Sequence, residues 1–476
     1  MKSNNIKFIA IAVILTLSSC GIPKIAIQEN TVSLPDSFNK TIKDSVRGGK
    51  VKWKGFFNDP YLSKLIDQAL VNNKELAILV QKVNMANNEI QARKGEYLPN
   101  LNFGAGDDLD KVGEFTRNGA VEENLNIKED TKFPNPLTNY KLGLYSSWEL
   151  DVWKKLRNAK KVAVMEYLAS QEGKNFLVTN LIAEVSQSYY ELIALDSQLS
   201  NLQENIKIQK NALEVVKLLK ESARTTSLAV KRFEAEVLKN ESEIYSIKQD
   251  IVETENKINF LIGRFPQAVE RNSNNFLNSE AKMIAVGLPS KLLENRPDIK
   301  KAELEMQAAK LNIKVARANF YPSFGLKVGV GLEAFNPKFL FNAPQSLLYS
   351  LAGDAVAPLI NRNAIKAAYK NASAKQIQMV FEYEQILLIA YSEVINNLSK
   401  IDNLEFSFQN KNKQVKALDE SVSISNQLFQ SARADYMEVL LTQRDVLEAK
   451  MSLISTKRDQ FIAMVKLYKS LGGGWN

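Results

Sequence analysis

Histidine is missing from this chain of 476 residues, and cysteine occurs only once. Without histidine there is no Ser-His-Asp triad, no Cys-His pair and no His-ligated metal site, and a single cysteine forms no disulfide within one chain. The phosphate-binding pattern G-x-x-x-x-G-K and the dinucleotide pattern G-x-G-x-x-G are absent too. We therefore expect no enzyme, no catalytic residues, no bound cofactor and no metal site.

The excess of positive charge is mild. Lys and Arg number 62 against 53 Asp and Glu, which gives a net charge of +9. These residues are spread along the chain without a dense basic block, which is typical of a solvated surface and not of a nucleic-acid-binding face. Hydrophobic residues make up 45% of the chain, enough to bury a large core.

The first twenty residues, MKSNNIKFIAIAVILTLSSC, have the pattern of an export signal. Lys2 and Lys7 accompany an apolar run at 8–17 that is too short to span a bilayer. The run ends in Leu-Ser-Ser-Cys, which resembles a bacterial lipobox. It predicts a signal peptide at 1–19, acylation of Cys20 by chains such as palmitate and anchoring in a Gram-negative-type cell envelope, so no nucleic-acid partner is expected. An ordinary secretory signal is the alternative.

Glycine and proline are absent from 174–262 and from 359–471. Their absence over so many residues favours very long helices. Apolar residues recur every seven positions in both stretches, which indicates helices packed side by side along their length. The series are Val178, Val185, Leu192, Leu199, Ile206 and Leu213; Val230, Val237, Ile244, Ile251 and Ile258; Val380, Leu387, Val394, Ile401, Phe408, Val415, Val422 and Phe429; and Leu440, Leu447, Ile454, Phe461 and Tyr468.

The tripeptide Ser-Ala-Arg occurs at 222–224 and again at 431–433, each time where one heptad series ends and the next begins. Asp435 and Glu438 form a D-x-x-E pattern suited to a helix start, with Asp435 as N-cap, and Thr226 stands at the equivalent position. Both sites are predicted to be turns at the tips, 222–227 and 431–436, of two long helical hairpins. A helix running through each site is the alternative.

Other pairs of segments recur in the same order, which indicates an internal duplication. R-N-A-K-K at 157–161 matches R-N-A-I-K at 362–366, and Pro99 aligns with Pro322. The expected division is a lipidated segment at 20–60, a first repeat at 61–265, a connector at 266–300, a second repeat at 301–471 and a tail at 472–476. Each repeat holds a helix, a β-hairpin (about 99–148 and 322–356) and a helical hairpin (about 158–262 and 360–470).

Strict alternation of apolar with small or polar residues marks the strands. It is clear at 140–149 and 323–333 and weaker at 99–106 and 346–356. This pattern over about ten residues is typical of transmembrane β-barrels. A soluble half-buried sheet is the alternative. Since the smallest outer-membrane barrels have eight strands and open edges do not face lipid, four strands per chain predict an oligomer.

Five segments together resemble the outer-membrane factor family of TolC-like channels, in the lipoprotein branch that serves resistance-nodulation-division efflux pumps. They are W-K-G-F-F-N-D-P-Y-L-S-K-L-I at 53–66, Y-K-L-G-L-Y-S-S-W-E-L-D-V-W at 140–153, E-N-K-I-N-F-L-I-G-R-F-P at 255–266, G-L-P-S-K-L-L-E-N-R-P-D-I at 287–299 and L-Y-K-S-L-G-G-G-W at 467–475.

The resemblance implies a mainly helical chain with transmembrane strands. A homotrimer would build a 12-stranded barrel above a helical tunnel that extends through the periplasm. An equatorial belt would draw on 261–300, which includes the connector, and on segments near both ends of the mature chain. It also implies a passive, gated conduit that works with a periplasmic membrane-fusion adaptor, an inner-membrane efflux pump and outer-membrane lipid. A lipid-anchored periplasmic coiled-coil adaptor or a structural lipoprotein is the alternative, and the residues do not assign the exported substrate.

In this family the hairpin tips meet the adaptor and form the closed end. Carried onto this chain, the candidate gate and adaptor-contact residues are Arg224, Thr225, Thr226, Ser227, Arg433, Asp435 and Tyr436. We expect Arg433, Asp435 and Tyr436 to help hold the constriction shut. The alternative is that Asp435 is only a helix cap and Arg433 only a solvated charge. The family commonly has glycine where Ala223 and Ala432 stand.

Overall fold

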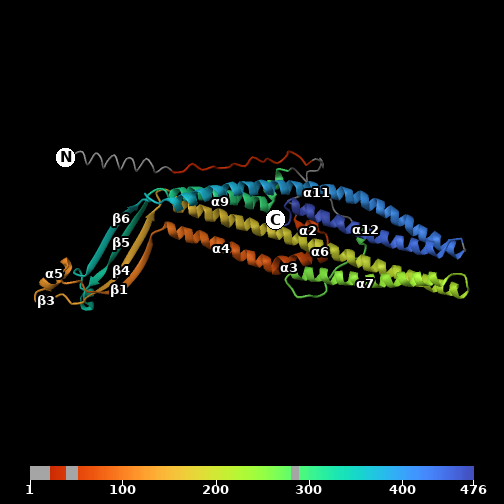
Figure 1. Ribbon diagram of the computed structural model, residues 1–476, viewed down its shortest axis with the longest axis horizontal. Helices are drawn as coiled ribbons and strands as arrows, with labels where there is room; N and C mark the ends of the chain where they lie inside the picture. Colours follow the sequence, from red (N-terminus) through yellow and green to blue (C-terminus); the bar gives the residue numbers. More distant parts are fainter. Residues whose placement is uncertain (1–21, 39–51, 280–288, 432, 476) are drawn as a thin grey trace. The chain divides into compact units, whose positions relative to one another are not determined.

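The computed structural model describes residues 22–38, 52–279, 289–431 and 433–475, which form two compact units (Figure 1). The sheet unit comprises the chain up to Glu29, Asn84–Leu168 and Leu304–Phe381. The hairpin unit comprises Asn30–Val83, Ala169–Glu303 and Glu382–Asn476. Each unit therefore combines segments from both halves of the sequence. The predicted acylation site, Cys20, lies outside the described residues.

The sheet unit is built around one four-stranded antiparallel sheet in the order β1-β4-β5-β6 (Figure 1). The strands are β1 (Asn100–Asp110), β4 (Leu137–Leu150), β5 (Ser323–Ala334) and β6 (Leu347–Val356). Alternation predicted all four, including the two weak candidates. The central pair, β4 and β5, comes from opposite halves of the chain, and β1 and β6 form the two edges.

The segment 107–139, long and rich in asparagine, is predicted from the sequence to be a surface loop after the first strand, but it holds regular structure. It contains the end of β1, the helix α5 (Arg117–Asn124) and a small pair of strands, β2 (Asn126–Lys128) and β3 (Thr131–Lys132). The Thr116 hydroxyl accepts a hydrogen bond from the Gly119 N–H at 3.1 Å, which caps α5. A shorter helix, α10 (Pro337–Leu340), lies between β5 and β6.

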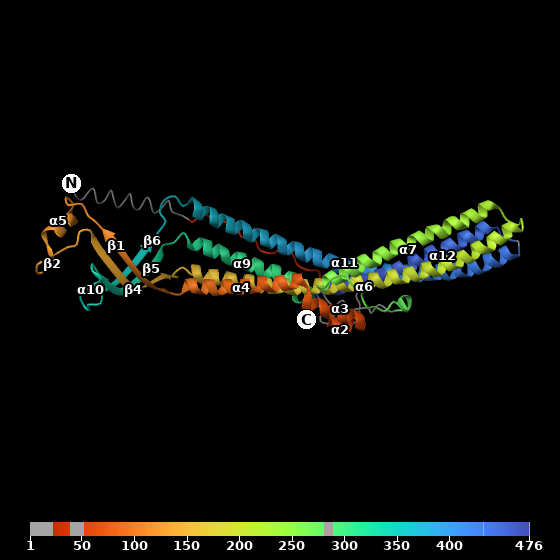
Figure 2. The same ribbon diagram turned by 90° about the horizontal axis from the view of Figure 1, so that it is seen from below.

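Four helices are longer than all the others that the structure describes. They are α6 (Lys155–Glu221), α7 (Ser227–Leu261), α11 (Asn363–Gln430) and α12 (Tyr436–Ser470). Within the hairpin unit, α7 runs back along α6 and α12 runs back along α11, and both turns lie at the same end of the unit (Figures 1 and 2). The shorter helices are α2 (Trp53–Phe56), α3 (Pro60–Asn72), α4 (Lys74–Tyr97), η2 (Phe276–Asn278), α8 (Lys291–Asn295) and α9 (Pro297–Ala318).

The core of the hairpin unit follows the predicted heptads. Val185, Leu192 and Ile258 on α6 and α7, like Val394 on α11, are fully buried. This main cluster also takes in the aromatic rings of Tyr189 and Tyr468. A second, smaller cluster lies next to the two turns.

Candidate functional site: a two-faced sheet and two hairpin tips

One face of the sheet is apolar. Residues paired across the strands point to the same side, and Phe103, Leu144 and Val330 lie opposite one another in register. The apolar side chains of this face are those of Leu101, Phe103, Ala105, Leu109, Tyr140, Leu142, Leu144, Trp148, Leu150, Phe324, Leu326, Val328, Val330, Leu332, Leu347, Tyr349 and Leu351. Asp107, Thr138 and Ser146 are polar residues on the same side. Several of these side chains are largely exposed, with Tyr349 at 80% and Leu351 at 74%.

The other face is polar and rich in glycine. The Tyr145 ring lies against Gly104 and Gly329 on the two neighbouring strands, where a Cβ atom would come within 3.1–3.2 Å of the ring. Lys141 pairs with Asp108 on β1 at 3.3 Å and with Glu333 on β5 at 3.5 Å. A sheet with one apolar and one charged face suits a wall between lipid and water.

Tryptophans mark the end of the sheet where the strands pass into helices. The Trp148 Nε1–H donates to the carbonyl of Tyr97 at 3.0 Å, and the Trp153 Nε1–H donates to the carbonyl of Pro322 at 2.7 Å. The Trp153 ring stacks on Tyr321 at 4.6 Å. Amphipathic rings of this kind are enriched at membrane–water interfaces.

Asp151 joins β4 to α6, a role that the sequence analysis missed although an acidic residue before a helix is a capping signal. Its carboxylate accepts from the N–H groups of Leu156 and Arg157 at 3.0 and 2.9 Å, and from the Arg157 guanidinium at 3.0 Å. Burial alone would raise the pKa of Asp151, but these hydrogen bonds outweigh it and hold the pKa below its usual value.

The first tip closes in a Schellman turn. The Arg224 N–H donates to the carbonyl of Leu219 at 2.8 Å and the Ala223 N–H to that of Lys220 at 2.9 Å. Ala223 has the left-handed φ of 53° that this turn requires and that glycine adopts more easily. Thr226 caps α7, because its hydroxyl accepts from the Ala229 N–H at 3.3 Å. Thr225 is half-buried, whereas Arg224 and Ser227 are exposed.

The second tip has a matching bond from the Arg433 N–H to the carbonyl of Leu428 at 2.8 Å. Asp435 occupies the N-cap position of α12, but its side chain makes no capping hydrogen bond, so the predicted cap bond is wrong. The Asp435 backbone carbonyl, not its carboxylate, accepts from the Glu438 N–H at 3.1 Å. Arg433 and Asp435 are exposed, while Tyr436 is half-buried against the cluster at the tips.

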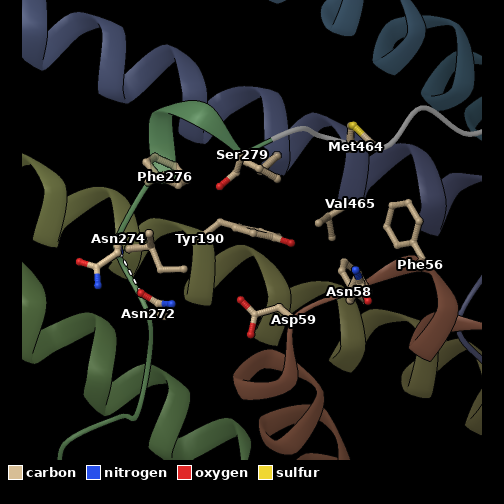
Figure 3. Close-up of a pocket in the computed structure, with 13 residues that line it drawn as sticks. Phe56, Asn58, Asp59, Tyr190, Asn272, Asn274, Phe276, Ser279, Met464 and Val465 are labelled. Atoms are coloured by element: carbon tan, nitrogen blue, oxygen red, sulfur yellow. Dashed lines mark hydrogen bonds between the residues drawn. The ribbon is translucent and has the colours of Figure 1, made fainter.

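A cavity of about 240 Å³ lies among α2, α6, α12 and the connector after α7 (Figure 3). The Tyr190 ring, stacked on Phe461 at 4.5 Å, projects its hydroxyl into the cavity near Asp59. Burial and the Asp59 charge both raise the pKa of Tyr190. Asp59 itself caps α3 and accepts from the Tyr189 hydroxyl at 2.8 Å. The cavity is thus bordered by groups that hold the helices together.

Arg296, Pro297 and Asp298, within the family segment at 287–299, have a structural role. Pro297 begins α9, and the Arg296 guanidinium bonds both carboxylate oxygens of Asp298, at 3.0 and 2.6 Å, and Glu393 at 2.7 Å. Across the part of the chain that the structure describes, no group of three acidic, Cys or His side chains is placed to hold a metal ion. In the same part, none of the helices combines the length and the apolar character needed to cross a membrane.

Comparison with known families decides the identity of the fold. A family model described as "Outer membrane efflux protein" matches residues 65–264 and 288–473, which is most of the chain. The chain belongs to this family. It is therefore an outer-membrane efflux channel and a passive conduit, not an enzyme, and the adaptor and structural-lipoprotein alternatives are set aside.

Individual relatives are similar in sequence to this efflux protein along nearly its full length. It is 26% identical to the probable outer membrane lipoprotein SilC of Salmonella typhimurium, over 99% of both chains. It is also 26% identical to the cation efflux system protein CusC of Escherichia coli O6:H1, over 98% of this chain and 99% of CusC.

Solved structures show the same fold. A crystal structure of CusC superposes with a TM-score of 0.81 at 25% identity, over 95% of this chain and 99% of that one. The open state of the MtrE outer membrane channel of Neisseria gonorrhoeae gives 0.83 at 23% identity, over 96% and 99%. The fold is that of trimeric channels, which work with periplasmic adaptors and inner-membrane pumps in tripartite efflux.

Proposed function

We propose that three copies of this efflux protein close one 12-stranded barrel, and that the two Ser-Ala-Arg tips provide its periplasmic gate and its adaptor contact. The observation that carries the barrel is the sheet itself. It has one apolar and one charged face, and its edge strands β1 and β6 each pair with only one other described strand. Unpaired backbone groups are too costly in lipid, so β1 of one copy pairs with β6 of the next.

The two halves of the chain support its origin in two repeats, at 61–265 and 301–471. Both halves run through a helix, two strands of the sheet, a very long helix and a shorter one. The long helices α6 and α11 have 67 and 68 residues, and α7 and α12 have 35 each. So close a match in length supports duplication and accounts for two similar tips in every copy.

The gate is assigned to the second tip. Among the described residues, neither Arg433 nor Asp435 makes an ion pair or a side-chain hydrogen bond within its own chain. Both side chains are exposed, so each is available to its counterpart on a neighbouring copy. A charge-assisted pair between copies, with the Tyr436 ring beside it, would close the tunnel at the threefold axis.

The first tip is assigned to the adaptor. Thr226 is already used as a cap, and Arg224, Thr225 and Ser227 lie around it at the end of the hairpin. Anchoring is assigned to acyl chains on Cys20, in contact with outer-membrane lipid, because several chains hold a protein more firmly than one.

The experiment is single-channel conductance of the purified protein in a planar bilayer, with the oligomeric mass measured in the same detergent. The proposal predicts a trimer with small, mostly closed currents that increase when Arg433 or Asp435 is replaced by alanine. A monomer that never inserts would overturn the barrel. A trimer whose closed-state current stays unchanged in both variants would overturn the gate.

A further inference from the structure

The apolar core of the hairpin unit is interrupted near the tips. The main cluster extends along α6 and α7 as far as Leu202, Ile206 and Ile247. A separate tip cluster consists of Leu213, Val216, Ala229, Val230, Phe233, Val237 and Leu440, with Phe429, Tyr436 and Met437 packed against it. The two clusters share no residue, although both lie along the same helices.

A layer of polar side chains occupies the gap. Each long helix has a second core position, three residues after each member of the heptad series given above. In α6 it holds Leu195, Leu202, Gln209 and Val216, and in α7 it holds Phe233, Asn240 and Ile247. The same position holds Gln443 in α12 and Ser425 in α11. These four, Gln209, Asn240, Ser425 and Gln443, form the polar layer. Their exposed fractions are 0%, 4%, 8% and 2%, so they are core residues.

Contacts between the helices put the four residues at one level. Asn240 Nδ2 donates to Gln209 Oε1 at 2.8 Å across α7 and α6. Gln198 on α6 bonds Ser455 on α12 at 3.1 Å, and Leu213 shares the tip cluster with Leu440. Because α6 and α12 are antiparallel, these two contacts place Gln443 at the same level as Gln209. The Lys450–Asp419 pair at 2.8 Å sets α11 in register with α12 in the same way, which brings Ser425 beside Gln443.

The polar layer is only partly hydrogen-bonded in this conformation. Gln209 Nε2 and Gln443 Oε1 are buried with no partner, as is Asn205 Oδ1 one turn away. A buried amide without a partner loses its hydration and gains nothing in return. In α6 and α7 the helices are therefore held less firmly here than in the apolar layers on either side. A small shift or an entering water molecule would improve the bonding.

We infer that the polar layer is the hinge at which the tip cluster turns on the main cluster when the channel opens. Tyr436 packs against the tip cluster, and Arg433 and Asp435 come directly before it in the second tip. A rotation of the cluster would therefore carry the gate with it. Hinges absorb motion in a few residues while packed bodies on either side stay intact. The inference rests on the proposed gate for its functional meaning, but the weak layer is testable without it.

The test replaces the layer with leucine in the intact trimer, as Gln209→Leu, Asn240→Leu and Gln443→Leu together. The matched control is Leu202→Met with Ile247→Leu, which alters the neighbouring layer but keeps it apolar. Hydrogen exchange is measured first. In the native trimer, we expect backbone amides around 205–212 and 240–243 to exchange faster than those of both clusters. The leucine variant should lose this difference in exchange rate, and the control should keep it. Uniform exchange in the native trimer would overturn the hinge.

Conductance then links the hinge to opening. In an Asp435→Ala background, the leucine variant should lose most of the added current, while the control keeps it. Full current through leucine-variant trimers would overturn the hinge. If Asp435→Ala alone adds no current, the gate fails, and the exchange result still decides the hinge. If the triple variant does not assemble, Gln443→Leu alone, which leaves the Asn240–Gln209 bond intact, repeats both measurements. Misassembly of that single variant as well would show a layer that fixes helix register, and would overturn the hinge.

Discussion

The two hairpin tips begin with the same tripeptide but satisfy their polar groups differently. At the first tip, the Thr226 hydroxyl caps α7 and the turn is complete within the chain. At the second, Asp435 stands at the same position and leaves its carboxylate without a capping bond. The two repeats thus differ at the cap position, where one side chain bonds within its own chain and the other, a carboxylate, does not. The difference suggests that the second tip is built for a contact outside its own chain.

The largest expected effect comes from removing that charge. Asp435→Ala should raise the closed-state current about tenfold or more, because a charge-assisted hydrogen bond contributes about 1.5–3 kcal/mol and 1.4 kcal/mol is a factor of ten. Single-channel recording measures it. Asp435→Asn is the control, since asparagine caps a helix as well as aspartate does but carries no charge. A closed asparagine variant would show that capping, not charge, matters here.

The turn residue of the first tip provides the next test. Ala223→Gly should stabilise that tip by about 1 kcal/mol. An L-residue in the left-handed region costs roughly 1–2 kcal/mol, and the larger conformational entropy that glycine loses on folding cancels part of this gain. Denaturant unfolding of the trimer measures the change. An unchanged or lower midpoint would mean that Ala223 carries no strain at φ 53°.

Loss of the cap should have a similar or smaller effect, and only on stability. Thr226→Ala removes the acceptor for the Ala229 N–H and should cost about 1 kcal/mol, with the closed current unchanged. The same unfolding and recording experiments apply. A channel that opens in this variant would make the two tips equivalent and remove the contrast between them.

The smallest effect is expected from the other tip arginine. Arg224→Ala should leave the conductance of the purified channel unchanged, whereas Arg433→Ala should raise it. Both side chains are exposed and follow the same Ser-Ala pair, so the two variants are closely matched. If both variants raised the current equally, the constriction would lie at both tips.

Much of the fold was accessible from the sequence because its patterns are long and regular. Heptads predicted the core of the four long helices, and alternation predicted all four strands of the sheet. The regular structure inside 107–139 was missed because α5, β2 and β3 are short and depend on local caps such as Thr116. Family membership then fixed the channel function, while the gate residues stay a proposal.

The rest depends on three-dimensional contacts that no repeat pattern contains. D-x-x-E predicted a side-chain cap at Asp435, yet the backbone carbonyl of that residue takes the bond instead. Gln209, Asn240 and Gln443 are ordinary polar residues in the sequence. Only the pairing of the helices reveals that they share one buried layer.

In the proposed closed gate, Arg433 of one copy pairs with Asp435 of another. Charge reversal in the planar bilayer tests this pairing most directly. Arg433→Asp and Asp435→Arg should each open the channel, because each sets like charges against each other. The double variant should close it again, since the pair is restored with exchanged signs. A double variant as open as either single one would contradict the pairing.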